Sequence, residues 1–145
     1  MELDKRGMQE LAAKIAAKLK GGEIFVLIGD LAAGKTFFTQ ALGKHLGAKK
    51  VKSPTFVVLE IHETDKKFKI AHFDFYRLQD KEIDWFEWSD YLGNPEYVSL
   101  VEWGEKIKPK LSNLNYFEIK MDFTDDENKR KISLSNNLEQ WLNKK

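Results

Sequence analysis

The first part of the chain alternates between helical and strand-like hydrophobic patterns. Apolar residues recur at helical spacing at Met8, Leu11, Ala12, Ile15 and Leu19. Asp4 before this series and the Gly21-Gly22 pair after it are typical signals for the start and the end of a helix. The uninterrupted apolar run Ile24–Ile28 then predicts a buried strand, because it leaves no room for charge on either face. Residues 35–47 return to helical spacing and end at a glycine; their inward positions are Phe38, Leu42 and Leu46.

The middle of the chain predicts a hairpin, a helix and another buried strand. Residues 55–63 and 68–76 are two strand-like runs separated by the polar sequence TDKK, which indicates an antiparallel pair. Residues 80–93 have a helical pattern that ends before Asn94-Pro95. The apolar run 97–103 contains one acid near its end, and its composition is that of a buried strand.

The last part predicts a second hairpin and a terminal helix. Residues 115–123 alternate strictly, so that Phe117, Ile119, Met121 and Phe123 are expected on one face and charged residues on the other. With the run 130–134 beyond the polar residues 124–128, they form a hairpin with one solvated face. A helix is expected within 138–145. Together these segments predict an α/β fold with a mixed parallel and antiparallel sheet flanked by helices.

Composition narrows the classes of protein to consider. The chain has 145 residues, a length typical of one domain, so residues 1–145 are expected to form a single domain. Lys+Arg number 24 and Asp+Glu 23, so no overall basic field favours nucleic acid as the default partner. The absence of cysteine excludes disulfides and thiolate chemistry. The start of the sequence is charged and no run approaches membrane-spanning length, so a cytoplasmic location without membrane contact is expected.

One motif carries explicit chemistry. GDLAAGKT, Gly29–Thr36, fits the pattern Gly-x-x-x-x-Gly-Lys-Thr and lies between a predicted strand and a predicted helix. In such a loop, successive backbone N–H groups at a helix N-terminus bind a polyphosphate. Lys35 is expected to contact the β- and γ-phosphates and the Thr36 hydroxyl to bind Mg²⁺. The expected nucleotide-binding residues of this phosphate loop are Gly29, Leu31, Ala32, Ala33, Gly34, Lys35 and Thr36.

A magnesium ion in this position requires a second protein oxygen, usually from an acid at the end of another buried strand. Asp74 and Glu102 both satisfy this description, and the residue pattern alone does not choose between them. We call them the strand-end carboxylates. His72 lies two residues before Asp74 and so shares its strand face, and a structural role is expected for it.

With these segments in place, the chain resembles the TsaE family, also called YjeE, over nearly its full length. Five motifs match in order: GDLAAGKT, VKSPTF, HFDFYRL, LVEW and RKISL. The family consists of bacterial P-loop ATPases required for making threonylcarbamoyladenosine on tRNA. The resemblance implies a P-loop NTPase-like fold, ATP and Mg²⁺ as ligands, and TsaB- and TsaD-type subunits as partners that carry out the transfer. Contact with tRNA itself is expected to be indirect or weak.

The resemblance also implies individual roles. Glu102 matches the family's metal-binding glutamate, beside Thr36, and Asp74 matches an acid near the γ-phosphate that orients water or senses the phosphate. Thr55 lies in a segment similar to a switch loop, so that Asp74, Thr55 and Lys35 form the expected catalytic group. Arg130 matches a position that approaches the nucleotide base or ribose.

Three positions depart from the family pattern. Ala32 replaces the usual glycine, and a positive φ there would cost on the order of 1 kcal/mol. Gly104 replaces a proline after Glu102-Trp103, and Met8 stands where the family often has a threonine near the nucleotide. The departure at Ala32 concerns affinity and not function, the one at Gly104 loosens the turn, and no site residue is expected at Met8.

Two other functions are compatible with the same loop: a small-metabolite kinase, or a regulatory subunit that binds nucleotide without hydrolysis. A kinase generally has an arginine-rich lid, whereas this chain has only Arg6, Arg77 and Arg130. Only Arg77 is a candidate to act on the γ-phosphate in cis, and its family-like YRL sequence is expected to brace the strand end instead. Hydrolysis is therefore expected to be slow alone and stimulated by partners.

Overall fold

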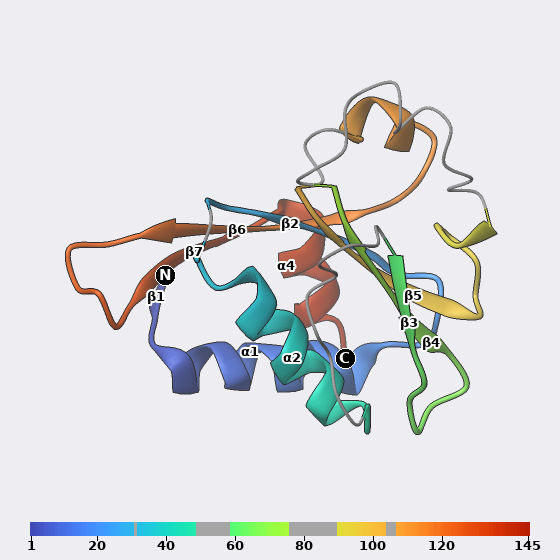
Figure 1. Ribbon diagram of the computed structural model, residues 1–145, viewed down its shortest axis with the longest axis horizontal. Coiled ribbons are helices and arrows are strands. Elements are labelled where there is room, and N and C mark those ends of the chain that lie inside the picture. The colour runs from blue at the N-terminus through green and yellow to red at the C-terminus, as the bar shows by residue number, and fades with distance from the viewer. Residues whose placement is uncertain (31, 49–58, 76–89, 104–106) are drawn as a thin grey trace.

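The protein is built on a seven-stranded sheet with the strand order β1-β7-β6-β2-β5-β4-β3 (Figure 1). The computed structural model describes residues 1–30, 32–48, 59–75, 90–103 and 107–145. In chain order the elements are β1 (Glu2–Leu3), α1 (Lys5–Lys18), β2 (Ile24–Ile28), α2 (Lys35–His45), β3 (Leu59–His62), β4 (Lys69–Asp74), β5 (Tyr97–Glu102), the 3₁₀ helix η3 (Lys108–Leu111), β6 (Phe117–Phe123), β7 (Arg130–Leu134) and α4 (Asn136–Asn143).

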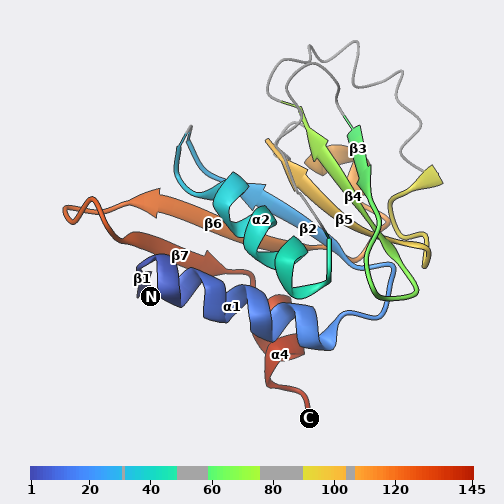
Figure 2. The ribbon, with the colours of Figure 1, turned by 60° about the horizontal axis from the view of Figure 1, so that its bottom comes forward.

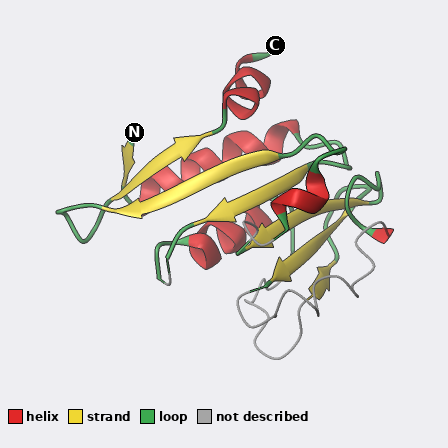
Figure 3. Cartoon of the chain, turned by 90° about the horizontal axis from the view of Figure 1, so that it is seen from above, coloured by secondary structure: helices red, strands yellow, loops and turns green. Residues whose placement is uncertain are grey.

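The centre of the sheet is parallel and its two sides are antiparallel. β2 pairs in parallel with β5 and β6, and β5 pairs in parallel with β4. The hairpins β3–β4 and β6–β7 are antiparallel, as is the short pair β1–β7. Seen from above, the β6–β7 hairpin extends beyond β2 (Figure 3). The predicted mixed sheet is confirmed, and the apolar run in β2 is explained by its central position.

Apolar side chains cover both faces of the sheet. α1 and α2 lie side by side on one face (Figure 2), and their buried residues form one core with β2, the even-numbered positions of β4 and β5, and β6. α4 joins the same core through Leu138 and Trp141, whose ring lies 5.1 Å from that of Phe117. A second core on the opposite face contains Phe73 and Val101. The carboxyl ends of β2, β4 and β5 are therefore held by packing on both sides.

The local signals for the first helix are confirmed. The Asp4 side chain caps α1 by accepting a hydrogen bond from the Gly7 N–H at 2.8 Å. The inward positions predicted within residues 35–47 are all buried, namely Phe38 and Leu42 in α2 and Leu46 at its C-cap. No helix in the described part of the chain is long and apolar enough to cross a membrane.

Some expectations are corrected or lie outside the described residues. Phe123 was expected on the apolar face, but it is 52% exposed, because the pairing of β2 with β6 ends at Lys120 and leaves Phe123 beside β7 alone. There the Arg130 guanidinium packs 4.7 Å from the ring centroid. β1 was not predicted, since two residues are too short to give a pattern. The expected helix over most of 80–93 and the start of the strand over 55–58 lie outside the described residues.

Candidate nucleotide-binding site

The phosphate loop connects the end of β2 to the start of α2, as the motif predicts. Gly29 is required by a close approach: a Cβ there would lie 2.7 Å from the main-chain oxygen of Met121 on β6. Gly34 is the N-cap of α2 and has φ 114°, a left-handed conformation that favours glycine. Both glycines therefore allow the backbone to bend tightly onto the helix N-terminus.

Ala32 lies in this loop with φ 64°. Ala32 therefore adopts the left-handed backbone conformation that is costly for a residue with a Cβ. The neighbouring Ala33 closes a turn by donating its N–H to the Asp30 carbonyl at 3.1 Å. The loop holds its shape at a local energetic cost of about 1 kcal/mol at Ala32.

Lys35 is buried rather than exposed, with 5% of its surface accessible. Its Nζ donates to the Gly29 carbonyl at 2.5 Å and lies 3.6 Å from the ring centroid of Trp103. An ammonium over an indole face is an attractive contact. Trp103 follows Glu102 directly and has φ 59°, a conformation uncommon for a bulky residue. The lysine thus connects the phosphate loop with the carboxyl end of β5.

The strand-end carboxylates lie side by side. Asp74 on β4 and Glu102 on β5 are partners in the parallel register, and Leu27 on β2 is the other neighbour of Glu102. Glu102 is 3% exposed, and its Oε2 lies 2.5 Å from Nε2 of His72, which is fully buried. His72 and Glu102 are thus diagonal neighbours on the sheet face that carries α1 and α2.

The polar groups near the loop suit a magnesium ion bound together with a nucleotide. Carboxylate and hydroxyl oxygens are hard ligands, and Mg²⁺ is usually held by one or two carboxylates with phosphates and water completing its shell. Thr36 is half-buried in the first turn of α2, directly after Lys35, which connects the phosphate loop to the end of β5. Within the described residues no group of three or more His, Cys, Asp or Glu side chains forms a metal cage of its own. The donor set fits an ion that a nucleotide brings with it.

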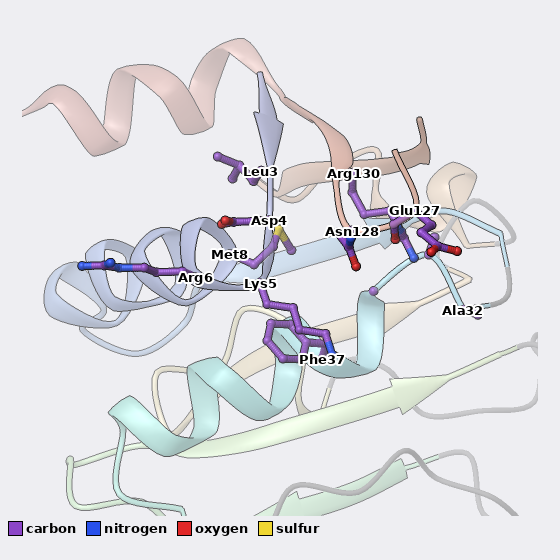
Figure 4. Close-up of a pocket in the computed structure, with 12 residues that line it drawn as sticks. Leu3, Asp4, Lys5, Arg6, Met8, Ala32, Phe37, Glu127, Asn128 and Arg130 are labelled. Atoms are coloured by element: carbon purple, nitrogen blue, oxygen red, sulfur yellow. The ribbon is translucent and has the colours of Figure 1, made fainter. Parts of the chain in front are cut away.

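A cavity of about 700 Å³ opens on the side of the phosphate loop away from β4 and β5 (Figure 4). It lies between the start of α1, the residues Ala32–Gly34 and the turn that joins β6 to β7. Arg130 lines this cavity, and its Nη1 donates to the carbonyls of Glu127 and Lys129 at 2.9 Å. The structure therefore brings Arg130 to the same cavity as the phosphate loop.

Several lining residues were not predicted from the sequence. Lys5 lies with its Nζ 5.9 Å from the ring centroid of Phe37, and Asn128 faces them from the hairpin turn (Figure 4). Met8, set aside as a departure from the family pattern, also lines the cavity. The residues come from three separate segments, and no local motif distinguishes them. Trp103, in contrast, could have been proposed as a site residue from the sequence, because it is an aromatic residue directly after an acid at a strand end.

The remaining predicted site residues, Leu31 and Thr55, lie outside the described residues, as does Gly104. Among the described residues, the structure brings Lys35 to the end of β5, pairs Asp74 with Glu102 and places Ala32–Gly34 and Arg130 around one cavity. The functional roles assigned to these residues stay predictions.

Comparisons with known proteins agree with this arrangement. The family described as "Threonylcarbamoyl adenosine biosynthesis protein TsaE" matches residues 3–132. The chain is similar to the tRNA threonylcarbamoyladenosine biosynthesis protein TsaE of Aquifex aeolicus, with 42% identity covering 86% of each chain. It is 38% identical to the protein of the same name from Rickettsia prowazekii, over 90% of this chain and 89% of that one. The fold is similar to the crystal structure of Bacillus subtilis YdiB, with a TM-score of 0.75 and 26% identity over 97% of this chain and 90% of that one. The chain belongs to the TsaE family.

Proposed function

We propose that this protein is an ATP-binding and ATP-hydrolysing subunit required for threonylcarbamoyladenosine modification of tRNA. The observation that carries the proposal is the phosphate loop between β2 and α2, with the strand-end carboxylates beside it. Family membership supplies the pathway, since its relatives carry the name of that biosynthesis. TsaB- and TsaD-type subunits are the proposed partners, with tRNA contacted indirectly or weakly, and the cytoplasm is the proposed location.

Each site residue has a defined task in this proposal. The N–H groups of the loop and the N-terminus of α2 bind the phosphates, and Lys35 leaves the Gly29 carbonyl to contact the β- and γ-phosphates. Thr36 and Glu102 hold Mg²⁺, which when bound neutralises charge on the phosphates. Asp74 orients the attacking water or senses the γ-phosphate, together with Thr55. Arg130 contacts the base or ribose from the cavity.

Slow hydrolysis by the isolated chain is part of the proposal. Acceleration requires positive charge on the γ-phosphate beyond the loop lysine and metal, often from an arginine. The Arg6 side chain is 87% exposed, pairs with Glu10 at 3.5 Å and runs away from the loop (Figure 4). The Arg130 guanidinium is engaged with the hairpin carbonyls. These two guanidinium groups are therefore engaged away from the strand-end carboxylates. Arg77, the one candidate to act in cis, lies outside the described residues, and in this proposal it braces the strand end while a partner supplies the activating group.

Steady-state phosphate release tests the proposal with the chain alone, with TsaB- and TsaD-type subunits, and with these subunits and tRNA. We expect slow turnover that rises on assembly. Fast turnover by the chain alone, unchanged by partners, would remove the switch function. Transfer of phosphate to an added metabolite would indicate a kinase, and ATP binding with no turnover in the full assembly would indicate a regulatory subunit.

A further inference from the structure

The strongest unassigned feature is the contact between His72 and Glu102. Both side chains are buried, at 0% and 4% exposure, and Nε2 lies 2.5 Å from Oε2. They come from neighbouring parallel strands, 30 residues apart in the chain. Burying an acid in this way is costly unless the acid is bonded or has a function.

The direction of this hydrogen bond follows from the chemistry of the two groups. An ionised carboxylate only accepts hydrogen bonds, so the proton of the bond belongs to Nε2 of His72. The imidazole therefore occupies Oε2 and fixes the plane of the carboxylate. Glu102 makes no side-chain hydrogen bond to any other described residue, so its Oε1 is available for another ligand.

The residues around Glu102 explain why its carboxylate needs to be held in one position. Asp74 lies beside Glu102 in the strand register, and the two carboxylates share one face of the sheet. A glutamate has three rotatable side-chain bonds, and a free carboxylate would populate several positions beside that second acid. A hydrogen bond from a buried ring removes this freedom, since the fully buried His72 is held by the packing of β4 and β5.

We infer that His72 is a positioning residue, which holds the Glu102 carboxylate through Oε2 so that Oε1 faces a divalent cation bound with the nucleotide. The inference rests on the metal-binding role of Glu102 in the proposed function. His72 touches neither the cation nor the nucleotide, and it acts only through Glu102. Groups that orient a metal ligand in this way change metal affinity by about 10- to 100-fold when removed.

The test measures Mn²⁺ affinity of the full-length protein with ADP bound, by the loss of the free Mn²⁺ signal in electron paramagnetic resonance. Mn²⁺ takes the same oxygen ligands as Mg²⁺ and needs no turnover for detection. His72→Met removes the donor at similar length, whereas His72→Gln keeps an N–H group near the position of Nε2. We expect His72→Met to weaken Mn²⁺ binding by about 10-fold and His72→Gln to restore most of it. ADP affinity measured in EDTA should stay unchanged in both variants.

Ile70→Ala is the matched control, because Ile70 is fully buried two residues earlier on the same face of β4. It should lower the thermal unfolding temperature without changing the Mn²⁺ affinity. If His72→Met fails to fold, His72→Asn takes its place, since its shorter amide does not reach Oε2. Equal Mn²⁺ affinity in the wild type and His72→Met, or an equal loss in Ile70→Ala, would overturn the inference.

Glu102→Gln separates this inference from the function on which it rests. A loss of Mn²⁺ affinity in Glu102→Gln with none in His72→Met overturns the positioning role alone. An unchanged affinity in Glu102→Gln overturns the metal-binding role of Glu102 and, with it, the inference. A loss in both variants, with rescue by His72→Gln, is the expected result.

Discussion

The phosphate loop has two sides that are built differently. On the side of β4 and β5, polar groups are buried and joined to one another, as His72 is to Glu102 and Lys35 to Gly29. On the side of α1 and the β6–β7 turn, the loop borders an open cavity lined by charged and exposed side chains such as Lys5 and Glu127.

The difference corresponds to two tasks. Catalytic groups need fixed positions, and burial with hydrogen bonding limits their movement. A cavity that receives part of a ligand needs space and solvent access before the ligand arrives. We therefore expect substitutions on the buried side to affect metal binding and turnover, and substitutions on the open side to affect affinity alone. Four predictions test this comparison, from the largest expected effect to the smallest.

Lys35→Ala should weaken ATP binding by roughly 100-fold or more, because hydrogen bonds from a charged donor to the phosphates are lost. Calorimetric titration measures the affinity. Lys44→Ala, at an exposed position in the last turn of the same helix, is the control and should bind ATP normally. Unchanged affinity in Lys35→Ala would contradict the assignment of Gly29–Thr36 as a phosphate loop.

Asp74→Asn should slow hydrolysis by about 100-fold while changing ATP affinity little, if the carboxylate acts on the water or the γ-phosphate. Glu102→Gln and Thr36→Ala should instead reduce the Mg²⁺ dependence of nucleotide binding. Turnover and binding are measured over a series of Mg²⁺ concentrations. Loss of Mg²⁺ dependence in Asp74→Asn, with Glu102→Gln normal, would reverse the roles of the two acids.

Arg130→Ala should weaken nucleotide binding by about 10-fold, because a cation lining the cavity is lost together with its bonds to the hairpin turn. The Mg²⁺ dependence should stay the same, in contrast to Glu102→Gln. Lys131→Ala removes a neighbouring exposed charge that does not line the cavity and serves as the control. A change in Mg²⁺ dependence in Arg130→Ala would break the distinction between the two sides.

Ala32→Gly should stabilise the folded protein by about 1 kcal/mol, because φ 64° is already present in the loop without nucleotide. ATP affinity should stay nearly unchanged if the bound loop keeps the same φ, since the strain is then equal in the free and bound states. Denaturant unfolding and calorimetric titration measure the two quantities. Ala33→Gly is the matched control: Ala33 is buried and does not have a positive φ, so a glycine there should lower stability. The same sign of change in both variants would contradict a local strain at Ala32.

Features encoded over short stretches of the chain could be predicted from the sequence. The helical spacing in α1 and α2, the apolar runs of β2 and β5, and the hairpin patterns all depend on residues within a few positions of one another. The phosphate loop belongs to the same class, since its glycines, lysine and threonine act within eight residues. Family resemblance added roles for single acids that spacing had left open.

The tertiary structure decided every contact between distant segments. Phe123 fits an alternating apolar pattern, yet its exposure depends on where the β2–β6 pairing ends. The bond between His72 and Glu102 requires the register of two parallel strands, and the contact of Lys35 with Trp103 requires the loop to fold back on β5. Local sequence fixes which way each side chain points along its own element, but the pairing of elements is set by the packing energy of the whole sheet. For that reason the phosphate loop could be predicted from eight residues, whereas the difference between its buried side and its open side depends on how the strands pair.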